Sequence, residues 1–167
     1  MAAAKLVPEL YCSDLERSLA FYVGCLGFAV QFRRPEERFA YLDRDGVEIM
    51  LEQPTGRTFL TAALEHPYGR GVNFQIEVAD VASLYAAVRA SPWRVVLELE
   101  DRWYRRDARA FGNRQFVIED PDGYVVRLFQ DLGSRPATVR HGDPDTPAGL
   151  TSRRRAGDVR LPASGPT

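Results

Sequence analysis

Arg127 is the residue of this sequence that most constrains its chemistry. It interrupts an otherwise apolar run in the second arm of the stretch NRQFVIEDPDGYVVRLFQ, residues 113–130. Apolar alternation on both sides of a Pro-Asp-Gly turn predicts a hairpin, so a strand with a buried character carries a guanidinium at its middle. That group has a fixed positive charge and only donates hydrogen bonds, which makes it unsuitable as a metal ligand. Its surroundings therefore decide between a metal-using enzyme and a binding protein.

Glutamates are predicted on the same kind of sheet face as Arg127. Period-two alternation puts Glu48 and Glu52 on one side of a strand, while Glu9 and Glu77 take similar places in two other strands. These faces are too polar to pack against helices. The four carboxylates could bind a hard cation. Buried charges are normally paired, however, so we expect some of them to pair with Arg127 and the others to meet solvent.

The strands that carry these residues belong to two copies of one sequence unit. The stretch VPELYCSDLERSLAFY (7–22) aligns with NFQIEVADVASLYAAV (73–88), and FAYLDRDGVEIMLEQ (39–53) aligns with FVIEDPDGYVVRLFQ (116–130). The second pair has the larger offset by eleven residues, which predicts an insertion around EDRWYRRDARAFG. Each copy predicts a strand, a helix and a three-stranded meander. The expected fold is α+β, with tandem βαβββ repeats at residues 5–53 and 71–131.

Apolar stripes predict one helix in each repeat. In the first, Ser13 or Asp14 can act as N-cap. The stripe residues are Leu15, Leu19, Tyr22 and Leu26 in the first repeat and Val81, Leu84, Tyr85 and Val88 in the second. Both stripes predict packing of a helix against a sheet. Because one repeat is too small to bury its sheet face well, we expect the two to associate.

Composition and charge limit the possible partners. The chain has 167 residues, a net charge of −1 and 45% apolar residues, without an apolar run long enough to span a bilayer. Pro8, Glu9 and Asp14 interrupt the start, so we expect no signal peptide and a cytoplasmic protein. Cys12 and Cys25 lie in no metal-binding motif. The first 133 residues carry no basic stripe, which argues against nucleic acid and leaves a small molecule as the expected ligand.

The remaining segment, residues 134–167, has no periodicity and is rich in Pro, Gly and Arg. We predict that it is a disordered tail, with the folded domain at residues 1–133.

Two motifs together resemble the vicinal oxygen chelate superfamily. They are the opening SDLERSLAFYVGCLGF and the close DPDGYVVRLFQ, and the resemblance extends over about residues 5–131. The superfamily includes glyoxalase I, extradiol dioxygenases, fosfomycin-modifying enzymes and bleomycin resistance proteins. The resemblance implies eight strands in two curved four-stranded sheets and a homodimer.

The resemblance also allows a test for metal. Metal-using members place one ligand on each of four strands, and these positions carry over to Val7, Met50, Asn73 and Arg127. These side chains form no usable ligand set. His66 precedes Pro67 in the connection between the repeats and His141 lies in the tail, so neither is placed to replace a ligand. The expectation is a protein without metal or cofactor and without catalytic residues.

Among metal-free members, the bleomycin resistance type matches best. Such proteins sequester a cationic glycopeptide in clefts of a homodimer, using aromatic faces and carboxylates. The stretch FGNRQF is similar to the family's W-G-x-R-E-F, with Phe111 in place of the tryptophan. The residues expected to bind the ligand are Phe32, Phe39, Glu48, Glu52, Gln75, Trp103, Tyr104, Phe111 and Arg127. The arginines of RWYRRDAR oppose a cationic antibiotic and suit a neutral or anionic aromatic compound better.

Other interpretations stay open from the sequence. Phe32 and Phe39 could equally be strand core. The chain could be an enzyme of the superfamily, lyase or dioxygenase-like, with a non-standard site around Glu48, Glu52 and Arg127. A carboxylate beside Arg127 should have a low pKa, however, which makes it a poor general base. A third possibility is a dimerising scaffold without a ligand.

Overall fold

The computed structural model describes residues 4–137, which form eight strands and two α-helices. The first repeat consists of β1 (Glu9–Tyr11), α1 (Leu15–Leu19) continued by a π-helical segment (Ala20–Cys25), β2 (Ala29–Arg34), a 3-10 turn (Pro35–Glu37), β3 (Phe39–Arg44) and β4 (Val47–Glu52). The second consists of β5 (Asn73–Glu77), α2 (Val81–Arg89), β6 (Val95–Arg106), β7 (Arg109–Glu119) and β8 (Val125–Pro136). No helix among the described residues has the length and apolar character needed to cross a bilayer.

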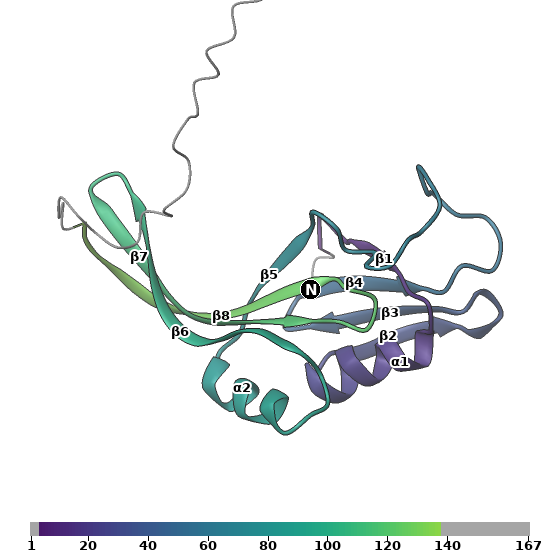
Figure 1. The fold of residues 1–167 in the computed structure, drawn as a ribbon, viewed down its shortest axis with the longest axis horizontal. Coiled ribbons are helices and arrows are strands. Elements are labelled where there is room, and N and C mark those ends of the chain that lie inside the picture. Colours follow the sequence, from purple (N-terminus) through teal and green to yellow (C-terminus); the bar gives the residue numbers. More distant parts are fainter. Residues whose placement is uncertain (1–3, 138–167) are drawn as a thin grey trace, which may run out of the picture. The chain divides into compact units, whose positions relative to one another are not determined.

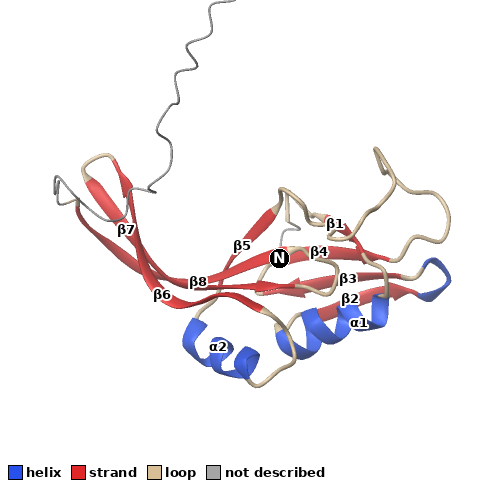
Figure 2. Cartoon of the chain, in the orientation of Figure 1, coloured by secondary structure: helices blue, strands red, loops and turns tan. Residues whose placement is uncertain are grey.

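Each repeat forms its own four-stranded mixed sheet. The strand orders are β1-β4-β3-β2 and β5-β8-β7-β6, with β1–β4 and β5–β8 parallel and the remaining pairs antiparallel. Both helices lie on the same side of the strands (Figures 1 and 2). The predicted α+β fold with two βαβββ repeats is confirmed.

The helical stripes pack into the core as the sequence predicts, with Leu84 and Tyr85 only partly buried. Asp14 is the N-cap of α1, where its side chain accepts a hydrogen bond from the Arg17 backbone N–H. Asp80 has the same role in α2. One core unites the two repeats, because stripe residues of both helices and the inner faces of both sheets belong to the same cluster of buried side chains. Cys12 and Cys25 are both free thiols.

The insertion of the second repeat lengthens its strands. β6 and β8 have 12 residues each and β7 has 11, whereas β2, β3 and β4 have six each. Their ends project beyond α2 (Figure 1). Trp103 and Tyr104, which belong to the predicted insertion, therefore lie in β6. β8 continues to Pro136, so residues 134–136 are strand and not the start of a tail. The rest of the predicted tail, residues 138–167, lies outside the described residues.

The DPDG turn of the second repeat is a joint between the repeats. The buried Asp120 carboxylate accepts hydrogen bonds from the Tyr22 hydroxyl at 3.0 Å and from the backbone N–H groups of Asp122 and Tyr124. Asp122 in turn accepts a hydrogen bond from the Ser13 backbone N–H at 3.1 Å. Burial nevertheless raises the pKa of Asp120 to about 6. These aspartates thus fasten the second sheet to the first helix.

Close packing of the backbone accompanies this joint. Gly123 has a φ of +87°, and a Cβ at this position would lie 2.2 Å from the Pro67 Cβ. Gly46, its counterpart in the first repeat, has a similar φ of +86°, but a Cβ there would meet nothing within 4 Å. The turn motif therefore recurs in sequence, but only its second copy holds the repeats together.

Candidate functional site

Each sheet has a face turned away from the helices. The first open face, on the sheet of β1–β4, carries the side chains of Glu9, Tyr11, Phe32, Arg34, Phe39, Tyr41, Asp43, Glu48, Met50 and Glu52. The second open face, on the sheet of β5–β8, carries those of Gln75, Glu77, Glu100, Tyr104, Phe111, Asn113, Gln115, Val117, Arg127 and Phe129. Alternation along each strand sends the intervening apolar residues into the core.

Three aromatic rings are grouped on the first open face. The Phe32 ring stacks on Tyr41, with centroids 5.0 Å apart, and lies 6.0 Å from Phe39. The guanidinium carbon of Arg34 lies 3.7 Å from the Phe39 centroid. Phe32 is 47% exposed and Phe39 only 2% exposed. Phe32 thus has a ring available for stacking, whereas the Phe39 ring is already covered.

The carboxylates of the first open face interact with one another. Partial burial and a hydrogen bond with Glu9 raise the pKa of Glu52 to about 7. Glu48 accepts a hydrogen bond from the Tyr41 hydroxyl, which raises the pKa of Tyr41. We expected a low pKa for a carboxylate at this site because of Arg127. That expectation is wrong for Glu52, because its neighbours here are mainly acidic and Arg127 lies in the other sheet.

Arg127 lies between neutral side chains near the start of β8. Its partners across the sheet are Gln75 on β5 and Val117 on β7. Its Nε is buried and has no hydrogen-bond partner, the only such side-chain atom among residues 4–137. No described carboxylate forms an ion pair with it. The expected pairing with glutamates is therefore wrong, because these residues lie on the other sheet or farther along their strands.

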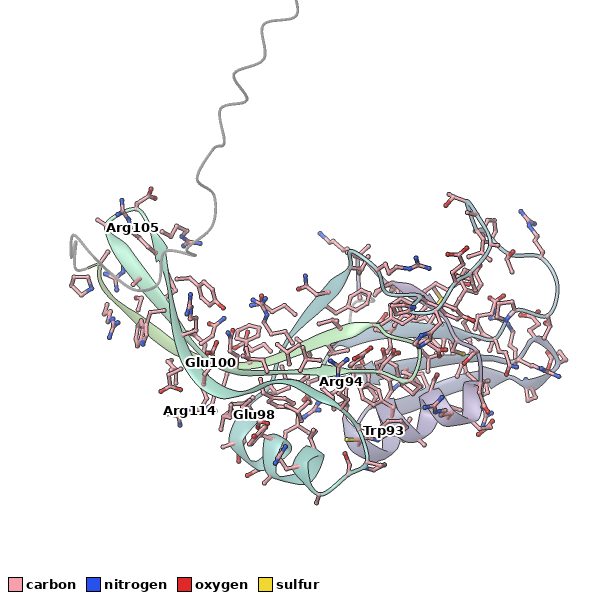
Figure 3. The ribbon with its side chains drawn as sticks, viewed as in Figure 1. Trp93, Arg94, Glu98, Glu100, Arg105 and Arg114 are labelled. Atoms are coloured by element: carbon pink, nitrogen blue, oxygen red, sulfur yellow. The ribbon has the colours of Figure 1, made fainter. Side chains whose placement is uncertain are left out.

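A cavity of about 420 Å³ opens on the second open face beside Arg127. Its lining residues are Gln75, Tyr104, Arg105, Arg106, Phe111, Asn113 and Arg127. Four of the nine predicted binding residues thus meet in one place, namely Gln75, Tyr104, Phe111 and Arg127. Figure 3 shows Arg105 at the far end of the β6–β7 hairpin, with Glu100 and Arg114 nearer to α2. Asn113, Arg105 and Arg106 were not predicted, although the alternation of arginines with Tyr104 and Phe111 in the sequence is a signal for them.

Trp103 is oriented differently from its neighbour Tyr104. A Cβ on Gly112 would lie 2.8 Å from the Trp103 ring, so this ring covers Gly112 on the other side of the hairpin. The guanidinium carbon of Arg135 lies 3.9 Å from its centroid. Trp103 does not line the cavity, whereas Tyr104 does and donates a hydrogen bond to Gln115.

A second hollow of about 550 Å³ adjoins Arg127 on its other side. Two further arginines, Arg70 and Arg94, belong to its lining. Each of them has a partner, because Arg70 pairs with Glu65 and Arg94 with Glu119. The unpaired charge of this region is therefore concentrated at Arg127 and on the hairpin side.

The positions at which related proteins would hold a metal do not fit one here. Met50 lies on β4, Asn73 on β5 and Arg127 on β8, and Val7 precedes β1. Residues 4–137 contain no group of three or more His, Cys, Asp or Glu side chains that could hold a metal ion. The His66 ring contacts Tyr68 in the connection between the repeats, and His141 lies outside the described residues. The guanidinium of Arg127 would repel a divalent cation and Val7 has no donor atom, so these four positions cannot form a metal site.

Residues 5–128 match the sequence profile of the Glyoxalase/Bleomycin resistance protein/Dioxygenase superfamily. The chain belongs to this superfamily. Bleomycin resistance proteins of Geobacillus stearothermophilus and Staphylococcus aureus are each 25% identical to it over 139 residues, which cover 77% of this chain and 97% of theirs.

Two solved structures have a similar fold. TioX from Micromonospora sp. ML1 has a TM-score of 0.59 with 24% identity, over 78% of this chain and 100% of that one. A protein of unknown function from Agrobacterium tumefaciens has a TM-score of 0.58 with 23% identity, over 79% of this chain and 97% of that one. At this identity the likeness concerns the fold alone.

Proposed function

We propose that this chain is a non-catalytic small-molecule binding protein of the bleomycin resistance type, which sequesters a bleomycin-like antibiotic or another aromatic ligand. The cavity beside Arg127 is the observation that carries the proposal. Its wall combines two aromatic rings that can contact a ligand with amides and charged groups that can orient it, and its volume of about 420 Å³ suits a small molecule. The metal-ligand positions of the superfamily, which hold a guanidinium and an apolar side chain, favour binding over metal-dependent catalysis.

The ligand would lie between two copies of the chain in a homodimer. Large apolar side chains are exposed on or beside both open faces, among them Phe32, Tyr104 and Leu97 at 47%, 39% and 37%. The first open face is rich in carboxylates, whereas the cavity of the second has arginines, so the faces of two copies have complementary charge. A cytoplasmic location belongs to the same proposal and is consistent with two free cysteines.

The first experiment is a calorimetric titration with metal-free bleomycin, combined with sedimentation at micromolar protein. We expect a dimer and saturable binding that Phe111→Leu and Phe32→Leu weaken at least about tenfold, because each variant removes an aromatic surface. Phe59→Leu is the matched control, since Phe59 is 74% exposed and lies outside both sheets. A monomer that does not bind bleomycin at 100-fold molar excess would contradict the proposal. A dimer that binds no aromatic compound would favour a scaffold.

An enzyme of the same superfamily is the second candidate, and the raised pKa of Glu52 favours it. A carboxyl with a pKa of about 7 can give or take a proton near neutral pH. Recovery of the ligand after long incubation, followed by mass spectrometry, separates the two functions. An unchanged mass supports sequestration. A mass change that Glu52→Gln abolishes would establish catalysis at the first open face.

A further inference from the structure

We propose that the cavity on the second open face is a subsite for an aromatic carboxylate, in which Arg127 and Arg106 bind the carboxylate while Phe111 and Tyr104 contact the ring. This inference rests on the proposed binding function. A bleomycin-like antibiotic is cationic, so the inference narrows the ligand to the other alternative, an aromatic compound, and gives it a negative charge.

The unpartnered Nε of Arg127 is the first argument. A buried N–H without an acceptor is rare in folded proteins, and leaving it so costs about 1–3 kcal/mol. Its cross-strand neighbours offer little remedy, because Val117 has no polar side chain and Gln75 carries no charge. A carboxylate bound beside the guanidinium pairs with its charge, and a small rotation of the Arg127 side chain then lets the same carboxylate accept the hydrogen bond of the Nε–H. The bound carboxylate thereby neutralises a charge that residues 4–137 leave without an ion pair.

The second argument is the charge of the whole cavity wall. Three of its seven residues are arginines and none is acidic. Elsewhere on this sheet arginines have partners, such as Arg114 with Asp101 at 2.7 Å and Arg94 with Glu119. Arg105, Arg106 and Arg127 form no ion pair with any residue that the structure describes. A cationic ligand would meet uncompensated positive charge here, whereas an anion is attracted.

Two acidic residues of the second open face lie near the cavity without lining it, namely Glu100 on β6 and Asp131 on β8 opposite Asn113. Glu100 accepts a hydrogen bond from the Gln115 side chain at 2.9 Å, and Asp131 accepts one from the Gly133 backbone N–H at 2.7 Å. Gln115 in turn accepts one from the Tyr104 hydroxyl. The two hydrogen bonds of Gln115 fix the Tyr104 ring at the edge of the cavity, and the three arginines of the cavity take no part in them.

The aromatic part of the ligand follows from Phe111 and Tyr104. The guanidinium carbon of Arg106 lies 4.4 Å from the Phe111 centroid, so a cation and a flat apolar surface adjoin each other. A guanidinium also binds a carboxylate in the plane of its two N–H donors, and the amides of Gln75 and Asn113 can donate to the same group. A planar acid of one or two rings satisfies both features and fits within about 420 Å³.

The test compares three probes that share one ring system: 2-naphthoate, its neutral amide 2-naphthamide, and the cation 2-naphthylmethylammonium. Calorimetric titration of the full chain should give binding of 2-naphthoate that is at least about tenfold tighter than that of either other probe. Arg127→Gln should lower the affinity for 2-naphthoate at least about tenfold and the affinity for the amide much less. Arg127→Lys keeps the charge but loses the planar pair of N–H donors, so its affinity for 2-naphthoate should lie between those of the unmodified chain and Arg127→Gln.

Arg89→Gln is the charge-matched control, because Arg89 lies on α2 and pairs with Glu98 away from the cavity. Its affinity for 2-naphthoate should equal that of the unmodified chain. Thermal unfolding of each variant shows whether it is folded. Equal or tighter binding of the amide or the cation would overturn the carboxylate subsite and leave the binding function intact. If none of the probes binds below millimolar concentration, the subsite is also wrong, and the separate bleomycin titration then decides the proposed function.

Discussion

The two open faces occupy corresponding places in a duplicated unit, yet they carry opposite chemistry. Met50 in the first sheet and Arg127 in the second stand at equivalent positions, each beside the parallel first strand of its repeat. Around Met50 lie Glu9, Glu48 and Glu52, and the last of these shares a hydrogen bond with Glu9. Around Arg127 the structure places amides, aromatic rings and further arginines. Duplication thus preserved the backbone while the charge of each open face changed independently.

The turns of the repeats differ in the same way. Gly46 and Gly123 have nearly the same φ, but only Gly123 lies against the chain that connects the repeats. A shared motif therefore has a local role in the first repeat and a global role in the second.

The largest effect is expected from alanine at these glycines. Gly123→Ala should lower the free energy of unfolding by roughly 2–4 kcal/mol, because it combines a positive φ with a Cβ 2.2 Å from Pro67. Gly46→Ala should cost only about 1 kcal/mol, since the space around it is open. Urea denaturation of both variants measures the difference. Equal losses would mean that the second turn is no more constrained than the first.

Arg127→Met should affect stability in the opposite direction. The substitution keeps an apolar stem and removes a buried N–H that has no acceptor, so we expect the unfolding free energy to rise by about 1 kcal/mol. The same variant should lose affinity for 2-naphthoate, and gain of stability with loss of binding is typical of a functional residue. Urea denaturation without ligand provides the measurement. A clear loss of stability would instead indicate that Arg127 has a structural partner.

Glu52→Gln should change the pH dependence of stability. The pKa of Glu52 is raised to about 7, chiefly by burial and then by its hydrogen bond with Glu9, so the folded chain holds a proton that the unfolded chain releases. Stability should therefore fall as the pH rises from about 4.5 to about 7, and this variant should flatten the fall. In this variant the pKa of Asp120, which is raised to about 6, still makes stability fall with rising pH below that value.

Melting temperatures between pH 4 and 8 test this expectation, with Glu36→Gln as the control for the loss of one glutamate. Glu36 lies in the exposed 3-10 turn of the same repeat. Parallel profiles of the unmodified chain and Glu52→Gln would show that folding does not raise the pKa of Glu52.

Strong local patterns made the fold predictable from the sequence. Two capped helical stripes and two acidic glycine turns occur in the same order in both halves, and these features were sufficient to predict the βαβββ repeat. The alignment without gaps failed in one detail. It matched Phe39 with Phe116, but Phe39 lies on the first open face, opposite Glu52, and Phe116 lies in the core. The register shows Tyr41 opposite Met50 and Val117 opposite Arg127, so the second hairpin is one residue longer. A shift of one residue exchanges the two faces of a strand.

The site was predictable only in part. Gln75, Tyr104, Phe111 and Arg127 do meet in one cavity, because alternation and strand order determine the face on which each lies. The sequence could not show that Trp103 turns to the other side of the hairpin, since that depends on the strand register of an insertion. It also could not show which carboxylates come close to Arg127, because the distances between charges depend on tertiary structure.

The joint at Asp120 and Asp122 is one-sided, so the two halves of the chain are not interchangeable. The turn of the second half accepts hydrogen bonds from Tyr22 and Ser13 of the first half, whereas the corresponding turn at Gly46 has open space around it. If the connection between the halves were cut within residues 54–64, the two fragments should therefore recombine as a first half with a second half. Two copies of the first half would lack the aspartates that close this contact, so a further duplication of that half would not generate a working protein.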